Sequence, residues 1–239
     1  MFWLRALWLV TALLVLIMVS AGFPVYFHQL RTVDACAICG SQRLTAGKLH
    51  QLQDLNIPVG VYAGYFAGLE ALSVAVYFVI AAVIFWRKSK EPLALLGAFM
   101  LLTWSASFSN IFGTVVDAHP TWYVPVQVIS YIGNLSFLTF FCVFPDGRFI
   151  PRWTRWLPVA GSAVTLYLLF FPKSVASIVF WLGSLASVVG VQVYRYRRVS
   201  NLMQRQQTRW VVFGVIVAIL GLLVAVVIGA LIGALQRQE

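Results

Sequence analysis

The feature that most constrains the fold of this chain is a series of long apolar runs separated by short polar segments. One run extends from Val61 to Trp86 and has Glu70 as its only charged residue. About 20 apolar residues in a helix are enough to cross the hydrocarbon core of a bilayer. Only 10% of the chain is charged, although soluble domains have about 25% charged residues. We therefore expect an all-α, polytopic helix bundle in the cell membrane, with the lipid bilayer as its main partner.

The apolar runs divide the chain into about seven transmembrane helices within a single domain, residues 1–239. The expected spans are 4–27, 61–86, 93–116, 122–144, 156–171, 175–194 and 210–235. The first run can also be interpreted as a signal peptide with a cleavage site at Val19-Ser20-Ala21. Its apolar character continues to Phe27, which favours a retained span.

The distribution of basic residues predicts the orientation of the spans. Twelve of the 17 Lys and Arg residues fall in alternate connections, namely Arg5, then Arg87, Lys88 and Lys90, then Arg148, Arg152 and Arg155, then Arg195, Arg197, Arg198, Arg205 and Arg209. The positive-inside rule places these segments, and therefore the N-terminus, in the cytoplasm. The net charge of +10 thus reflects membrane orientation and attraction to anionic lipid, and we exclude nucleic acid as a partner.

This orientation places the loop of residues 28–60 outside the cell. Residues 44–55 predict a short amphipathic helix in this loop, with Thr45 as its N-cap. Cys36 and Cys39 form a C-x-x-C motif in the same loop, where a local disulfide would persist. A redox-active pair is the alternative interpretation. The spacing of the histidines does not support a zinc site, and we expect no metal and no cofactor.

Glu70 is the only acidic residue inside a predicted span, and it lies near the middle of the bilayer. Carboxylates at this depth usually face the interior of a helix bundle. Asn110 and Gln127 lie in the same outer half of the membrane and are its candidate partners. Glu70 is therefore either an intramembrane switch or ligand contact, or one side of a hydrogen bond that only holds helices together.

The last span carries small residues at every fourth position, which are Gly221, Ala225, Gly229 and Gly233. Such a stripe lets two helix backbones approach closely. The partner helix belongs either to the same chain or to a second copy, so a homodimer is one prediction of this stripe.

Two cytoplasmic segments carry a resemblance to a known family. They are Phe144-Pro-Asp-Gly-Arg-Phe-Ile-Pro-Arg-Trp-Thr-Arg-Trp156 and the segment from Arg197 to Gly214, whose core is Gln204-Arg-Gln-Gln-Thr-Arg-Trp210. Both resemble the membrane-embedded N-terminal sensor regions of bacterial two-component histidine kinases of the Chloroflexi and Gram-positive type. The motif residues carried over are Asp146, Gly147, Arg148, Arg205, Gln206, Gln207 and Arg209. The resemblance covers residues 30 to 215.

The resemblance implies a sensory input module that acts on a kinase domain or on a response regulator. The family places its phospho-acceptor and ATP-binding domains after the last span, and this sequence has no such domains. We therefore expect a truncated or stand-alone sensor half without catalytic residues of its own, whose full-length parent would be a histidine kinase. The alternatives are a small transporter, a thiol-linked membrane enzyme and a membrane assembly subunit.

Overall fold

The computed structural model describes residues 2–33, 43–170 and 175–198, together with single positions at 213, 214, 217 and 221. The regular secondary structure of the described part is helical, apart from an isolated bridge between Val33 and Leu44. Its helices are α1 (Phe2–Arg31), α2 (Ala46–Asp54), α3 (Val59–Lys88), α4 (Pro92–Phe108), α5 (Asn110–Ala118), α6 (Tyr123–Val143), α7 (Trp156–Phe170) and α8 (Val175–Arg198). Short 3-10 turns, η1 (Pro120–Trp122) and η2 (Arg152–Arg155), precede α6 and α7.

Three helical segments are long and apolar enough to cross a membrane: Phe2–Arg31, Val59–Lys88 and Pro120–Val143. A fourth candidate consists of α4 and α5 together, which are bent by 57° at the break between them. The apolar part of α8, Val179–Arg195, is shorter than these. The described residues thus confirm an all-helical fold with three to four candidate membrane spans, and the count of seven and the cytoplasmic N-terminus stay predictions.

The large apolar side chains on the outer faces of α1 and α3 are exposed. Leu13, Leu72 and Val79 are among them, with 60%, 61% and 56% of their surface accessible. A soluble protein rarely leaves a contiguous apolar surface of this kind uncovered. This outer surface therefore fits a lipid environment.

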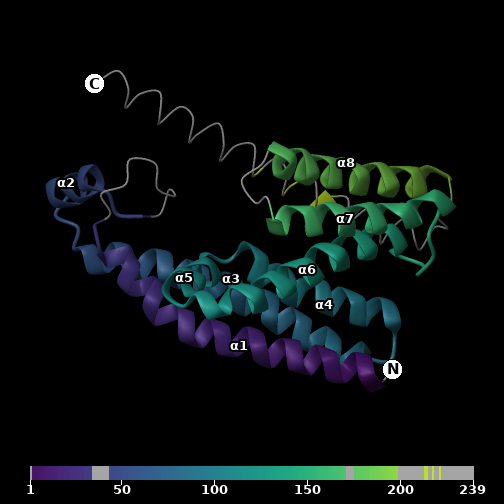
Figure 1. Cartoon of the computed structure of the whole chain (residues 1–239), viewed down its shortest axis with the longest axis horizontal. Helices are drawn as coiled ribbons and strands as arrows, with labels where there is room; N and C mark the ends of the chain where they lie inside the picture. Colours follow the sequence, from purple (N-terminus) through teal and green to yellow (C-terminus); the bar gives the residue numbers. More distant parts are fainter. Residues whose placement is uncertain are drawn as a thin grey trace.

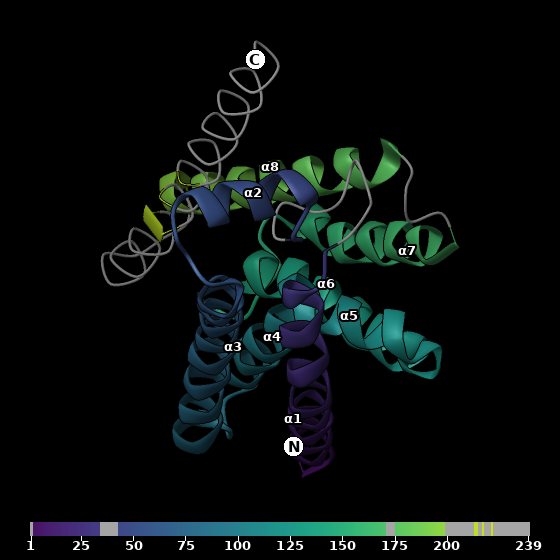
Figure 2. The ribbon, with the colours of Figure 1, turned by 90° about the vertical axis from the view of Figure 1, so that its left-hand side faces the viewer.

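The interior is formed by α1, α3, α4 and α6, which pack side by side (Figure 1). Met18 of α1, Ala81 of α3 and Leu102 of α4 are fully buried in one cluster that also contains Ile129 of α6. A second apolar cluster joins Phe137 and Phe141 of α6 to Val188 of α8. Helices α7 and α8 lie on the opposite side of α6 from α1 and α3 (Figure 2).

The connections of the bundle alternate between its two ends (Figure 1). The start of α1 and the α3–α4 connection lie together, and Arg5 Nε donates a hydrogen bond to the carbonyl oxygen of Ser89 at 3.2 Å. The α6–α7 connection lies at the same end, and α2 lies at the opposite end (Figure 1). The basic clusters that precede α4 and α7 are therefore gathered at one end, which we call the basic end.

Helix α2 forms where the sequence predicts it. The Thr45 side chain accepts a hydrogen bond from the main-chain N–H of Lys48, so the predicted N-cap is confirmed. The helix ends before Asn56, which adopts a positive φ of 54°. Asparagine tolerates this conformation better than most residues, so it allows the chain to turn into α3.

Candidate functional site

The segment expected as a single span over 93–116 is broken at Ser109, which separates α4 from α5. Ser109 has extended backbone angles, and its Oγ accepts a hydrogen bond from the main-chain N–H of Ile111 at 3.3 Å. Serine competes in this way with the helical hydrogen bond, which explains why it caps helices more often than it continues them. The local sequence Ser109-Asn110 therefore ends one helix and starts the next.

Glu70 stabilises the same break from the neighbouring helix α3. Its Oε1 accepts a hydrogen bond from the main-chain N–H of Asn110 at 2.6 Å. This N–H belongs to the first turn of α5, where donors have no partner within the helix and where the helix dipole favours a negative charge. The carboxylate of Glu70 thus acts as an N-terminal cap supplied by a different helix.

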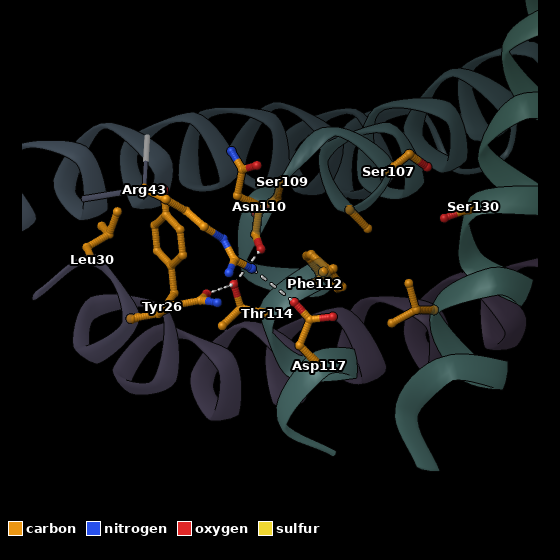
Figure 3. Close-up of a pocket in the computed structure, with 14 residues that line it drawn as sticks. Tyr26, Leu30, Arg43, Ser107, Ser109, Asn110, Phe112, Thr114, Asp117 and Ser130 are labelled. Atoms are coloured by element: carbon orange, nitrogen blue, oxygen red, sulfur yellow. Dashed lines mark hydrogen bonds and ion pairs between the residues drawn. The ribbon is translucent and has the colours of Figure 1, made fainter. Parts of the chain in front are cut away.

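A cavity of about 490 Å³ lies beside this break, a volume in the range of small-molecule sites. Its wall comes from α1, from both sides of the Ser109 break, from the start of α6, and from the segment before α2 (Figure 3). The lining residues are Tyr26, Gln29, Leu30, Arg43, Ala106, Ser107, Ser109, Asn110, Phe112, Gly113, Thr114, Asp117, Val126 and Ser130. The cavity is therefore rich in hydroxyl and amide groups, although it lies between apolar helices.

Hydrogen bonds fix two parts of the cavity wall (Figure 3). The Thr114 hydroxyl lies 2.9 Å from Gln29 Oε1 and 3.0 Å from the carbonyl oxygen of Asn110, so it can donate to either oxygen. Arg43 Nη2 forms an ion pair with Asp117 Oδ2 at 3.3 Å. Their side chains are 37% and 63% exposed, which places this pair at the mouth of the cavity.

The predicted trio of Glu70, Asn110 and Gln127 is brought together only in part. Glu70 contacts its predicted partner Asn110, through the main-chain N–H of Asn110. Gln127 is half-buried on α6 and does not line the cavity, although its neighbours Val126 and Ser130 do.

A second polar cluster lies at the basic end, around Arg195 of α8. This side chain forms an ion pair with Asp146, and its residue is only 1% exposed. Its Nη1 donates to the carbonyl oxygens of Cys142 at 2.7 Å and of Arg148 at 2.9 Å. We call the contacts of Arg195 with Asp146, Cys142 and Arg148 the Arg195 clasp.

The Arg195 clasp satisfies groups that the end of α6 leaves open. The last carbonyls of a helix have no donor within it, and cations are favoured near them. Next to the clasp, Gln192 Nε2 donates to the carbonyl oxygen of Phe141 at 2.7 Å. Gly147 follows with a φ of +74°, and its N–H donates to the carbonyl oxygen of Val143. This left-handed turn explains the glycine of the Asp146-Gly147-Arg148 motif.

Sequence reasoning missed both the cavity and the clasp. It treated Arg195 only as an orientation charge, although Arg195 is almost fully buried. The available signal was the polar side chain of Gln192 within span 175–194, because a polar residue in a span needs a partner on another helix. Gln29, near the end of α1, was the corresponding signal for the cavity.

Several predicted residues lie outside the described part of the chain. They are Cys36 and Cys39, the motif residues Arg205, Gln206, Gln207 and Arg209, and the packing residues Ala225, Gly229 and Gly233. Gly221 is described as an exposed helical residue. Within the described residues no group of three or more His, Cys, Asp or Glu side chains could hold a metal ion.

The cap formed by Glu70 leads to a first prediction. We expect Glu70→Ala to lower the free energy of unfolding by about 1–2 kcal/mol, because the Asn110 N–H loses its acceptor. Glu70→Gln keeps an acceptor oxygen and loses only the attraction between charge and helix dipole, about 0.3–1 kcal/mol. Unfolding by SDS titration in mixed micelles measures both changes.

A matched control for this prediction is Glu91→Ala. Glu91 is exposed and pairs with Lys88 one helical turn away, so its loss is expected to change stability by less than about 1 kcal/mol. Equal losses for Glu70→Ala and Glu91→Ala would show that the contact with α5 contributes nothing specific.

None of the family models, curated proteins or solved structures compared with the chain matches it.

Proposed function

We propose that this chain is a membrane-embedded signal-input module of the two-component type, with seven spans and its N-terminus inside the cell. The observation that carries the proposal is the position of the two polar clusters. The cavity at the Ser109 break lies between the helices toward the end that carries α2. The Arg195 clasp lies at the opposite, basic end. A signal received at the first cluster and read out at the second would cross the membrane.

Helix α6 gives this proposal a physical route. Ser130 of α6 lines the cavity, and the carbonyl oxygen of Cys142 at the other end of α6 accepts from Arg195. A ligand that shifts α6 relative to α1 and α5 would therefore change the geometry of the clasp. Transmission of this kind requires a two-state element, and the bent α4–α5 segment is the candidate for it.

The resemblance to two-component sensor regions supports the same proposal. Asp146 belongs to the first motif that carries it, and Arg195 lies two residues before the second motif at Arg197. The ion pair between Asp146 and Arg195 thus connects the first segment to the end of α8, directly before the second segment. A response regulator or a separate kinase domain would be the cytoplasmic partner, and a homodimer would be the signalling unit.

The proposed function is tested in the bacterial host by phosphate-affinity electrophoresis of its response regulators. Deletion of the gene is expected to change the phosphorylated fraction of one regulator, and Asp146→Asn is expected to produce a change in the same regulator. Arg152→Gln, which alters an exposed arginine of the same connection, is the matched control. If no regulator responds to the deletion, the two-component assignment fails.

The proposed topology leads to a second prediction, measured with alkaline phosphatase fusions. Fusions after Asn56, His119 and Glu239 are expected to be active, because these positions lie outside the cell. Fusions after Lys90 and Arg152 are expected to be inactive, because basic connections stay in the cytoplasm.

The same positions fused to green fluorescent protein provide the control, since that reporter fluoresces only on the cytoplasmic side. An inactive phosphatase fusion at Glu239, together with the expected pattern elsewhere, would show that residues 210–235 do not form a seventh span. The reverse pattern at every position would show that the bundle has the opposite orientation in the membrane.

One observation favours transport as a second candidate function. Transporters often build their substrate site from discontinuous helices inside the membrane, and the α4–α5 break lines a polar cavity. Swelling of proteoliposomes in gradients of ammonium chloride, glycine or glycerol tests this alternative. Solute-specific swelling that Ser130→Leu abolishes would favour transport over signal input.

A further inference from the structure

The backbone hydrogen bonds of the two helix ends that meet at the Ser109 break differ. In a continuous helix, the N–H groups of Asn110 and Ile111 would donate to the carbonyl oxygens of Ala106 and Ser107. Here the Asn110 N–H donates to Glu70, and the Ile111 N–H donates to Ser109 Oγ. The protein thus caps the positive end of α5, and these donors are withdrawn from the last turn of α4.

The two residues whose carbonyl oxygens would accept these donors in a continuous helix belong to the cavity wall. They are Ala106 and Ser107. Their carbonyl oxygens lie at the C-terminal end of α4, which carries the negative end of a helix dipole. Carbonyl groups at such half-helix ends coordinate cations in membrane transporters, where unwound segments line a cavity.

The remaining lining residues favour the same kind of ligand. Asp117 is the only acidic residue among the described lining residues, and its partner Arg43 is the only basic one. Away from this pair the polar groups are the uncharged hydroxyls and amides of the wall, beside the aromatic rings of Tyr26 and Phe112. Aromatic rings and oxygen acceptors both attract cations.

We propose that this cavity binds a small monovalent cation with an ammonium group, placed against the carbonyl end of α4. An ammonium group donates three hydrogen bonds and accepts none, so it suits the carbonyl oxygens at the end of α4. A carboxylate in the same place would face the negative end of α4 and the carbonyl oxygens. The inference rests on the proposed function, because it names the ligand class of the same cavity.

The experiment measures thermal unfolding of the full chain in lipid nanodiscs. The probes, added at equal concentration, are ethanolammonium chloride, its neutral analogue ethylene glycol, its anionic analogue sodium glycolate, and sodium and potassium chloride. A solute that binds only the folded chain raises the unfolding temperature in proportion to its occupancy. Ethanolammonium is expected to raise it, and the glycol and glycolate are expected to leave it unchanged relative to the salts.

Three variants locate the binding. Ser130→Leu fills the cavity from α6 and is expected to weaken ethanolammonium binding at least tenfold. Ser187→Leu makes the same change in a separate hollow between α6, α7 and α8 and is expected to leave binding unchanged. Asp117→Asn alters an exposed carboxylate, so it is expected to fold, and it should weaken binding about two- to fivefold. If Ser130→Leu does not fold, the weakening of ethanolammonium binding by Asp117→Asn tests the inference.

The outcomes separate this inference from the proposed function. A shift with sodium or potassium and none with ethanolammonium would overturn the assignment of an ammonium group. An equal shift with ethylene glycol, or no shift with any cation, would overturn the inference. Either of these results would leave the phosphorylation test of the input module unaffected, since that test measures a response regulator.

Discussion

Replacing Arg195 with methionine is expected to lower the free energy of unfolding by about 3–5 kcal/mol, the cost of removing one partner of a buried ion pair. Arg195 is 1% exposed and pairs with Asp146, whose side chain is 20% exposed. The substitution also removes the donors to the carbonyl oxygens of Cys142 and Arg148. The methionine has a similar length, so lost polar contacts account for most of the effect.

Three further variants decide whether the pair itself matters. Asp146→Asn should cost less than Arg195→Met, because asparagine keeps a carbonyl acceptor for the guanidinium. The double variant should cost less than the sum of the two single changes, since contacting residues couple by about 0.5–3 kcal/mol. Arg152→Met removes an exposed arginine from the same connection and should change stability little.

SDS titration in mixed micelles measures all four free energies. If Arg195→Met and Arg152→Met cost the same, burial of Arg195 contributes nothing and the Arg195 clasp is not an anchor for α8. If the double variant costs the full sum of the single changes, Arg195 and Asp146 act independently.

The sequence was sufficient to predict where three of the long helices lie. The expected spans 4–27 and 61–86 lie within α1 and α3, and 122–144 overlaps α6 closely. The reason is that hydrophobicity and helix length are local properties, and a membrane requires every spanning segment to satisfy its own backbone. The bend at Ser109 was missed because the whole run from 93 to 116 is apolar enough to be one span.

The candidate sites were less predictable, because they depend on how the helices pack. Glu70 stands out in the sequence as a single carboxylate in an apolar run, but its acceptor role depends on the main chain of Asn110 on another helix. Arg195 looked like one more orientation charge among several arginines. Its burial follows from the position of α8 against the end of α6, which no local pattern encodes.

Gly22→Ala is expected to destabilise the fold by about 1–3 kcal/mol, the usual cost of overpacking a tight interface. A Cβ atom at Gly22 would lie 2.3 Å from Val115 Cγ2 and 2.6 Å from Ile111 Cγ2. It would also lie 3.1 Å from the carbonyl oxygen of Ile111, and this main-chain atom cannot move without α5. Helix α1 must therefore separate from α5 to admit even one methyl group.

Gly64→Ala is the matched control, because a Cβ atom at Gly64 of α3 meets nothing within 4 Å. Alanine is favoured over glycine inside a helix by about 0.5–1 kcal/mol, so this variant is expected to be neutral or stabilising. Val115→Ala in the Gly22→Ala background should recover part of the loss, since it removes the closer methyl group. Equal effects of Gly22→Ala and Gly64→Ala on SDS unfolding would rule out a close α1–α5 contact.

The Gly22 variant also tests whether the α1–α5 contact shapes the cavity. Tyr26 lies one helical turn after Gly22 on α1 and lines the cavity, and Thr114 lies on the facing helix α5. Separation of the two helices would stretch the hydrogen bond between Thr114 and Gln29, which is 2.9 Å long. Gly22→Ala is therefore expected to weaken ethanolammonium binding, and Gly64→Ala is expected to leave it unchanged. A Gly22→Ala chain that loses stability and keeps its affinity would show that the α1 wall is not required for binding, so that the site would depend on α4, α5 and α6 alone.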